Sequence, residues 1–170
     1  MIQVYTGNGK GKTTAAWGLA LRAVGHGLKV AAVQFLKPPI SGERLAGARL
    51  SPQLAVFGET RPYNPNLDQR ESPELRADSR SNFELAVSLT RSKNWDVLIL
   101  DEINVVLHYG FVSQCEMLDL LNSAPNDMEI VCTGRSAPEW LIKIADLVTE
   151  MNCIKHPYEI GTSARRGIDY

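Results

Sequence analysis

The stretch "TGNGKGKTT", residues 6–14, decides the fold of this chain. Three glycines, two lysines and three threonines fall within these nine residues, and a short apolar run at 2–5 precedes them. A segment with the pattern of an amphipathic helix follows. In a glycine-rich turn between a strand and a helix, successive backbone N–H groups point inward, and the helix dipole adds positive potential. The stretch therefore predicts a loop that holds phosphate.

The end of this loop fits the pattern G-x-x-x-x-G-K-[S/T], although Thr6 stands where its first glycine is expected and a glycine comes one residue later. Lys12 is expected to reach the outer phosphates, and the Thr13 hydroxyl is expected to bind Mg²⁺. The strand before the loop and the helix after it favour this interpretation over a chance glycine-lysine turn. The predicted phosphate-binding residues are Gly7, Asn8, Gly9, Lys10, Gly11, Lys12, Thr13 and Thr14.

An apolar run that ends in two acids, "VLILDE" at residues 97–102, supplies a carboxylate of the kind that lies near the metal in such sites. If the strand continues through Asp101 and Glu102, their side chains alternate, so only one can point at the metal while the other orients a water. We expect Thr13, Asp101 and Glu102 to hold Mg²⁺ or Mn²⁺. Together with the loop, this run predicts binding of a metal-bound nucleotide.

Two arginines are further candidates for contact with phosphate. Arg22 comes ten residues after Lys12 on the same helix, which is roughly 15 Å along its axis and favours a solvated arginine. Arg135 follows an apolar run at 128–133, just before the start of a helix, where ligands meet parallel sheets. Both are retained as nucleotide-binding candidates.

Apolar runs alternate with helical segments along the chain, which predicts an α/β fold. Runs such as VAAV and VLIL lack polar alternation, as expected for strands covered on both faces. We predict a mostly parallel central sheet of about six strands with helices on both faces, a P-loop NTPase (RecA-like) fold in a single domain over residues 1–170. The predicted strands are 2–5, 28–36, 54–57, 95–101, 128–133 and 147–152.

Helix ends are marked by local sequence signals. A glycine pair around His26 is expected to end the first helix. Ser72-Pro73 is expected to begin another, because proline is tolerated at the first helical position. The segments 113–116 and 136–139 have the capping-box pattern, in which serine and glutamate each bond the backbone of the other.

The composition sets limits on function. The 170 residues carry a net charge of −1 and a pI near 6.3, so no basic field favours nucleic acid or membrane binding. No apolar stretch approaches the ~18 residues of a membrane span. The three cysteines are isolated, which fits reduced thiols in the cytoplasm better than disulfides or a zinc site.

Residues 58–73 break the alternation of strands and helices. This segment contains three prolines, two asparagines and five charged residues without periodicity, and it predicts a long surface loop between a strand and a helix. Such loops serve either as connectors or as functional elements. Tyr63 is its only aromatic residue.

The motifs in their order along the chain resemble the ATP:corrinoid adenosyltransferases, the family that makes adenosylcobalamin. The opening from "VYTGNGKGKTT" to "VQFLK" is similar to the start of the family, and "KHPYEIGTSARRGIDY" is similar to its end. Between them, "GER", "LDEIN", "TGRSAP" and "ADLVTEM" follow in the same order at 42–44, 100–104, 133–138 and 145–151. The resemblance therefore covers nearly the whole chain.

The resemblance implies transfer of the 5′-deoxyadenosyl group of ATP to a reduced Co(I) corrinoid, with release of triphosphate. Co(I) is a strong nucleophile, so the reaction needs no serine, cysteine or histidine base, and none is arranged here. Lys12, the loop N–H groups and Mg²⁺ on Thr13 and Glu102 would neutralise the departing triphosphate. The resemblance therefore implies Lys12 and Glu102 as the catalytic residues. The resemblance also implies a reductase that supplies electrons to the corrinoid, and a second copy of the chain as partner in a homodimer.

The chain departs from the family in the loop that corresponds to 58–71. Members tend to have a phenylalanine and a tryptophan close together there, working against the lower face of the corrin, whereas this chain has Tyr63. Tyr63 is therefore the candidate on the corrin side, in a loop expected to act as a lid. Two alternatives stay open: a P-loop ATPase or kinase, and a non-catalytic nucleotide- or corrinoid-binding regulator.

Overall fold

The computed structural model describes residues 1–37, 41–58, 61, 70–156, 161, 163 and 165–168. Six strands of the described chain form one sheet in the order β3-β2-β4-β5-β1-β6, and every neighbouring pair is parallel. The strands are β1 (Ile2–Thr6), β2 (Val30–Gln34), β3 (Leu54–Phe57), β4 (Val97–Asp101), β5 (Glu129–Thr133) and β6 (Leu147–Glu150). The helices are α1 (Lys12–Gly25), α2 (Gly42–Arg49), α3 (Pro73–Ser92), α4 (Ile103–His108), α5 (Gln114–Ser123) and α6 (Glu139–Ile144).

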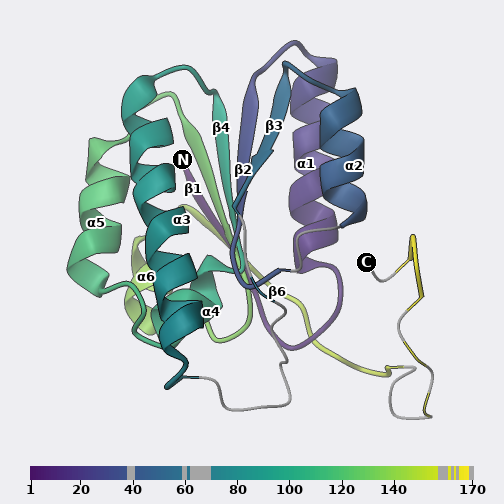
Figure 1. The fold of residues 1–170 in the computed structure, drawn as a ribbon, viewed down its shortest axis with the longest axis vertical. Coiled ribbons are helices and arrows are strands. Elements are labelled where there is room, and N and C mark those ends of the chain that lie inside the picture. The colour runs from purple at the N-terminus through teal and green to yellow at the C-terminus, as the bar shows by residue number, and fades with distance from the viewer. Residues whose placement is uncertain are drawn as a thin grey trace.

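Helices cover both faces of the sheet, as Figure 1 shows, with α1 and α2 on one side and α3 and α5 on the other. The strands serve both sides because successive side chains alternate. In β4, Leu98 and Leu100 join the core beneath α3 and α5, whereas Val97 and Ile99 join the core beneath α1. The residues that α1 buries fully in its core are all alanines, Ala16, Ala20 and Ala23, which lets the helix approach the sheet closely.

The strand order brings the two predicted parts of the site together. One strand, β5, separates β1, which leads into the glycine-rich loop, from β4, which ends at Asp101. All of these strands are parallel, so their carboxyl ends lie at one edge of the sheet. The prediction of a mostly parallel α/β fold with helices on both faces is therefore confirmed.

The predicted strand boundaries are too long at four places, in one of them by a single residue, because the run 128–133 forms a strand only from Glu129. The apolar run 28–36 gives a strand only over Val30–Gln34, because Leu36 has a left-handed φ of 51° that ends the extended backbone although its side chain is buried. The run 95–101 begins pairing at Val97. The strand β6 ends at Glu150, and the next residue turns against the glycine-rich loop, where the Gly9 N–H donates to the Met151 carbonyl.

Three of the four expected helix signals are confirmed. The helix α1 ends at Gly25, and Ser72 caps α3 with Pro73 in the first turn. Ser113 and Glu116 form the capping box of α5. The capping box expected at 136–139 is wrong: α6 begins after Pro138 and has no side-chain cap, because Ser136 adopts a left-handed φ of 55° and lies outside the helix.

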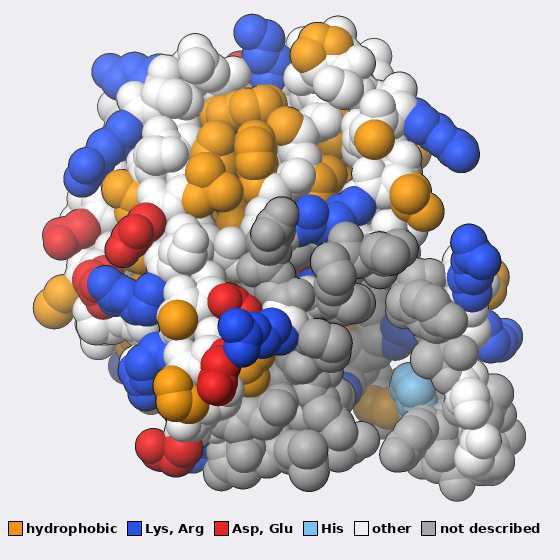
Figure 2. Space-filling view, viewed as in Figure 1, with side chains coloured by type: hydrophobic (Ala, Val, Ile, Leu, Met, Phe, Trp, Pro, Cys, Tyr) orange, Lys and Arg blue, Asp and Glu red, His pale blue; other side chains and the backbone are white. Residues whose placement is uncertain are grey.

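The edge of the sheet at β3 is only partly covered. Ala55, Val56 and Phe57 are half-buried, and Figure 2 shows a hydrophobic patch between α3 and α2 on this face. No helix in the described part of the chain is long and apolar enough to span a membrane. Most of the irregular segment 58–73, including Tyr63, lies outside the described residues.

Candidate functional site

The glycine-rich loop is shaped by its contact with the chain that follows β6. Gly7 has a φ of 91°, and a Cβ built on it would lie 2.5 Å from the Met151 carbonyl oxygen. A Cβ on Gly9 would lie 2.7 Å from the same oxygen. At Gly11 a φ of 120° allows the loop to turn directly into α1. The positive φ favours glycine at Gly7 and Gly11, and the close approach of the Met151 backbone requires it at Gly7 and Gly9.

Lys12 begins α1 and folds back across the loop. Its Nζ donates hydrogen bonds to the carbonyl oxygens of Gly7 and Gly9, each at 2.7 Å, and the residue is 7% exposed. Burial lowers the pKa of Lys12, and Glu102 opposes that change. The ammonium therefore lies inside the loop, at the position expected of a group that meets phosphate.

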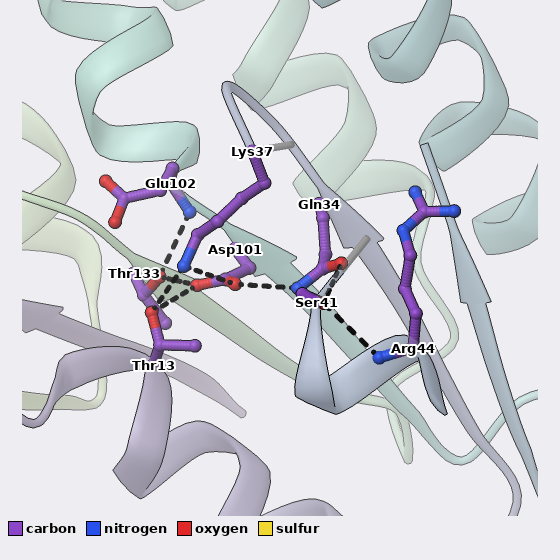
Figure 3. Close-up of polar contacts among 8 residues, drawn as sticks. All are labelled: Thr13, Gln34, Lys37, Ser41, Arg44, Asp101, Glu102 and Thr133. Carbon is purple, nitrogen blue, oxygen red and sulfur yellow. Dashed lines mark hydrogen bonds and ion pairs between the residues drawn. The ribbon is translucent and has the colours of Figure 1, made fainter. Parts of the chain in front are cut away.

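Asp101 is the buried acceptor at the centre of the site. Its Oδ1 accepts hydrogen bonds from the hydroxyls of Thr13, at 2.9 Å, and Thr133, at 2.7 Å. Its Oδ2 accepts from the side-chain amide of Gln34 at 3.4 Å (Figure 3). The carboxylate thus connects the first turn of α1 with the ends of β2 and β5.

Glu102 does not continue the strand. The strand β4 ends at Asp101, and Glu102 has a left-handed φ of 70° and precedes α4. Gly134 makes room for its carboxylate, since a Cβ there would lie 3.2 Å from Glu102 Oε2. Burial, followed by the charge of Asp101, raises the pKa of Glu102 against the opposing charges of Lys37, Lys12 and Arg135. The two acids therefore escape the strict alternation expected of a continuing strand.

A cavity of about 850 Å³ opens beside the loop. Its polar part includes Glu102 and Arg135, whereas an apolar part lies between α1 and α2 and includes Trp17 and Leu50. Of the predicted residues, those lining the cavity are Asn8, Gly9, Lys10, Gly11, Lys12, Thr13, Thr14, Glu102 and Arg135.

The other predicted residues lie elsewhere. Gly7 shapes the loop without lining the cavity. Asp101 does not line the cavity either, but it accepts a hydrogen bond from the hydroxyl of Thr13, which does. Arg22 is exposed in the last turn of α1, at the opposite end of the helix from the loop. Tyr63 is outside the described residues.

Sequence reasoning missed three groups at this site. Lys37 follows β2, and its Nζ lies 3.3 Å from Asp101 Oδ2. The Thr133 hydroxyl accepts from the Glu102 N–H at 3.0 Å while it donates to Asp101. The C-terminal segment also reaches the loop, because Lys10 Nζ donates to the Ile168 carbonyl at 3.1 Å. Lys37 and Thr133 share a signal that could have found them: each follows or ends a parallel strand at its carboxyl edge.

The oxygen atoms around Thr13 suit a hard divalent cation. Mg²⁺ prefers hydroxyl and carboxylate oxygens and completes its coordination with phosphate and water, so it needs few protein ligands. Thr13 and Asp101 supply such oxygens, Glu102 lies beside them, and a cation, the Lys37 ammonium, already lies against both Thr13 and Asp101. Among the described residues no three His, Cys, Asp or Glu side chains cluster as a metal site. The donor set fits a metal held jointly with a nucleotide.

A parallel sheet in which a glycine-rich loop places a lysine and a threonine beside a strand-end aspartate defines a P-loop nucleotide-binding protein. The fold is RecA-like: the RadB recombinase structure superposes with a TM-score of 0.52, covering 92% of this chain and 76% of that chain at 19% identity. The chain belongs to the ATP:corrinoid adenosyltransferase BtuR/CobO/CobP family, whose sequence model matches residues 1–170.

Individual relatives agree with the family model. The corrinoid adenosyltransferase of Escherichia coli (strain K12) is 37% identical over 173 residues, covering all of this chain and 85% of that protein. The corrinoid adenosyltransferase of Pseudomonas aeruginosa is 33% identical over 173 residues, with 100% and 83% coverage. Corrinoid adenosyltransferase CobA of Salmonella typhimurium is 35% identical over 173 residues, with 100% and 85% coverage.

Proposed function

We propose that this chain transfers the 5′-deoxyadenosyl group of ATP to the Co(I) centre of a corrinoid. The observation that carries the proposal is the placement of Lys12, Thr13, Glu102 and Arg135 around one cavity in a member of this family. The cavity combines cations for a triphosphate with an apolar region, and ATP and a corrinoid together present both kinds of surface.

In this reaction the electron pair of Co(I) forms a bond to C5′ of ATP. The bond from C5′ to the phosphate oxygen breaks, and its electron pair leaves with the triphosphate. The protein does not need to generate a nucleophile, so its task is to align C5′ with cobalt and to stabilise the leaving group. Negative charge grows on the bridging oxygen, and cations held close to it lower the barrier.

The loop residues are proposed to hold the triphosphate. Lys12 would exchange its bonds to the Gly7 and Gly9 carbonyls for phosphate oxygens. The loop N–H groups from Lys10 to Thr13 would supply further donors, whereas the Gly9 N–H is already bonded to the Met151 carbonyl. Arg135, which lines the same cavity, is proposed to add a second cation. Arg22, in the last turn of α1, is the least supported of the proposed nucleotide contacts.

Thr13, Asp101 and Glu102 are proposed to hold Mg²⁺, or Mn²⁺ in its place. The ion would neutralise charge on the triphosphate when it is bound. Asp101 keeps the Thr13 hydroxyl in place in the nucleotide-free protein, and Thr133 fixes both Asp101 and the Glu102 backbone.

On the corrin side, Tyr63 and the loop 58–73 are proposed to contact the macrocycle. Aromatic packing of this kind is worth on the order of 1 kcal/mol beyond burial. A separate reductase is proposed to supply the electron that converts Co(II) to Co(I), and the protein is proposed to act in the cytoplasm as a homodimer. The free thiols of Cys115, Cys132 and Cys153 support a reducing compartment.

Incubation with ATP, Mg²⁺ and a chemically reduced corrinoid tests the proposal. The expected result is the visible spectrum of an alkylated corrinoid together with one equivalent of triphosphate. Formation of ADP and phosphate would instead identify an ATPase or kinase. Corrinoid binding without turnover would identify a regulator. The chemical reductant removes the need for the reductase, so the assay reports on the transfer step alone.

A further inference from the structure

Lys37 reaches into the site from the end of β2. The preceding residue, Leu36, is buried and has a φ of 51°, so the backbone turns here and directs the lysine back over the sheet edge. Lys37 Nζ lies 3.3 Å from Asp101 Oδ2 and donates a hydrogen bond to Thr13 Oγ1 at 3.0 Å (Figure 3). The side chain is 22% exposed and Asp101 is fully buried. The ammonium is therefore the counter-charge of the central carboxylate.

The surroundings of Lys37 keep it charged. Burial would lower its pKa, but the carboxylates of Asp101, Glu102 and Glu43, with the hydrogen bond to Asp101, together raise it above its ordinary value. An ion pair of this kind cannot lose one partner without leaving the other charge uncompensated in the interior. Any event that removes the ammonium must therefore bring another cation to Asp101.

The oxygen atoms that Lys37 contacts are those proposed to hold the metal. Mg²⁺ binds oxygen ligands at about 2.1 Å, so an ion on Thr13 Oγ1 would lie within about 5 Å of an ammonium 3.0 Å from the same atom. At that separation the two positive charges repel by several kcal/mol in a partly buried site, so each disfavours the presence of the other. Lysine has a flexible four-carbon stem and a compact charge, which allows its head group to move without movement of the backbone.

We propose that Lys37 is a resident cation of the metal site, which exchanges with the metal when metal-bound ATP enters and then pairs with the triphosphate. Lys37 lines the same cavity as Lys12 and Thr13, so the displaced ammonium has an anionic partner within that cavity. This inference rests on the proposed function in one respect, namely that the entering ligand is a metal-bound triphosphate. Lys37 would then protect Asp101 in the nucleotide-free protein and stabilise the leaving group in the complex.

The exchange is tested first without nucleotide or corrinoid, by titrating the full chain with Mn²⁺ and following free Mn²⁺ by electron paramagnetic resonance. Lys37→Met removes the competing charge and is expected to bind Mn²⁺ more tightly than the wild type, by about tenfold or more. Lys37→Arg keeps the charge and should bind as weakly as the wild type. Lys143→Met, which removes an equal charge from the exposed side of α6, is the matched control and should leave Mn²⁺ binding unchanged. Equal Mn²⁺ affinity in Lys37→Met and the wild type would overturn the exchange.

The pairing of Lys37 with the triphosphate is tested by calorimetric titration of ATP at saturating Mg²⁺ without corrinoid. Lys37→Met should bind ATP about tenfold more weakly, since a charge-assisted contact is lost, and Lys37→Arg should recover part of that loss. Unchanged ATP affinity in Lys37→Met would overturn the pairing with triphosphate.

If Lys37→Met does not fold, Lys37→Gln, whose amide keeps a donor beside Asp101, takes its place in both titrations. Failure of the wild type to bind metal and ATP together would count against the proposed function, whereas the Mn²⁺ titration judges Lys37 independently of it.

Discussion

At the scale of single residues, Lys12 and Lys10 form a matched pair within one loop. Lys12 is buried and bonds two loop carbonyls, whereas Lys10 is exposed and bonds the Ile168 carbonyl. We expect Lys12→Ala to weaken ATP binding by about 10- to 100-fold, because a hydrogen bond to a charged group contributes roughly 1.5–3 kcal/mol. Lys10 is proposed to contribute its backbone N–H to the loop, and Lys10→Ala keeps that group, so this variant removes the same charge but should have a much smaller effect. Calorimetry with Mg²⁺ and ATP measures both, and near-normal binding by Lys12→Ala would remove this residue from the site.

Glu102 gives a prediction with a defined pH dependence. Its carboxyl must be ionised to help hold a metal. Because its pKa is raised, the carboxyl becomes protonated at a higher pH than that of an ordinary glutamate. Metal-dependent ATP affinity should therefore fall as pH drops toward that raised pKa. Glu102→Gln should bind metal more weakly at neutral pH, recover partly at high Mg²⁺ or with Mn²⁺, and lose most of the acid-side dependence. An unchanged pH profile in Glu102→Gln would assign the titration to another group.

At the scale of elements, the start of α5 is fixed by a carboxylate that serves two helices. Hydrogen bonds from the Ser113 hydroxyl and N–H, with the contact to Arg80 on α3, lower the pKa of Glu116 from 4.5 to about 2. A lowered pKa adds stability that is complete above the unfolded value and is lost as pH falls toward about 2. This contribution is therefore present at neutral pH.

We expect Glu116→Gln to lower the melting temperature at pH 7 by roughly 2–4 °C. The estimate takes about 1 kcal/mol for an exposed, screened pair with a helix cap and the usual slope for a chain of this length. The difference from the wild type should vanish near pH 2. Scanning calorimetry across pH 2–7 measures it, with Glu84→Gln on the exposed side of α3 as the control. A difference that persists at pH 2 would mean that packing rather than charge is lost.

The helix boundaries that could be predicted from the sequence are those marked by local signals. Ser72-Pro73 and the 113–116 capping box are local, and both are confirmed. The 136–139 box failed because a left-handed residue moved the helix start, and the end of β4 at Asp101 could not be read from an apolar run that continues into Glu102. Lys37 and Thr133 were missed because their roles depend on strand order: β2 and β5 both lie beside β4 only in the folded sheet.

At the scale of the whole molecule, one sheet contains strands from both ends of the described chain. We therefore expect a single cooperative unfolding transition, as for one domain. ATP with Mg²⁺ at about 100 times its Kd should add about 2.7 kcal/mol, which corresponds to a rise in melting temperature of roughly 5–10 °C for a chain of this length. Calorimetry with and without the nucleotide measures both quantities. Two separate transitions, only one of which responds to ATP, would contradict the single-domain prediction.

The position of β1 has a consequence for how this protein is made. Its two neighbours in the sheet, β5 and β6, are formed from residues 129–150, so within the described sheet the strand that is synthesised first pairs with the two that are synthesised last. Contacts so distant in sequence form late and slowly. We therefore expect the nascent chain to carry its nucleotide loop unformed through most of translation, and its exposed apolar strands to be prone to aggregation during that interval. A ribosome that stalls before residue 129 has emerged is therefore expected to hold a chain that cannot bind nucleotide, although the glycine-rich loop itself has long been synthesised.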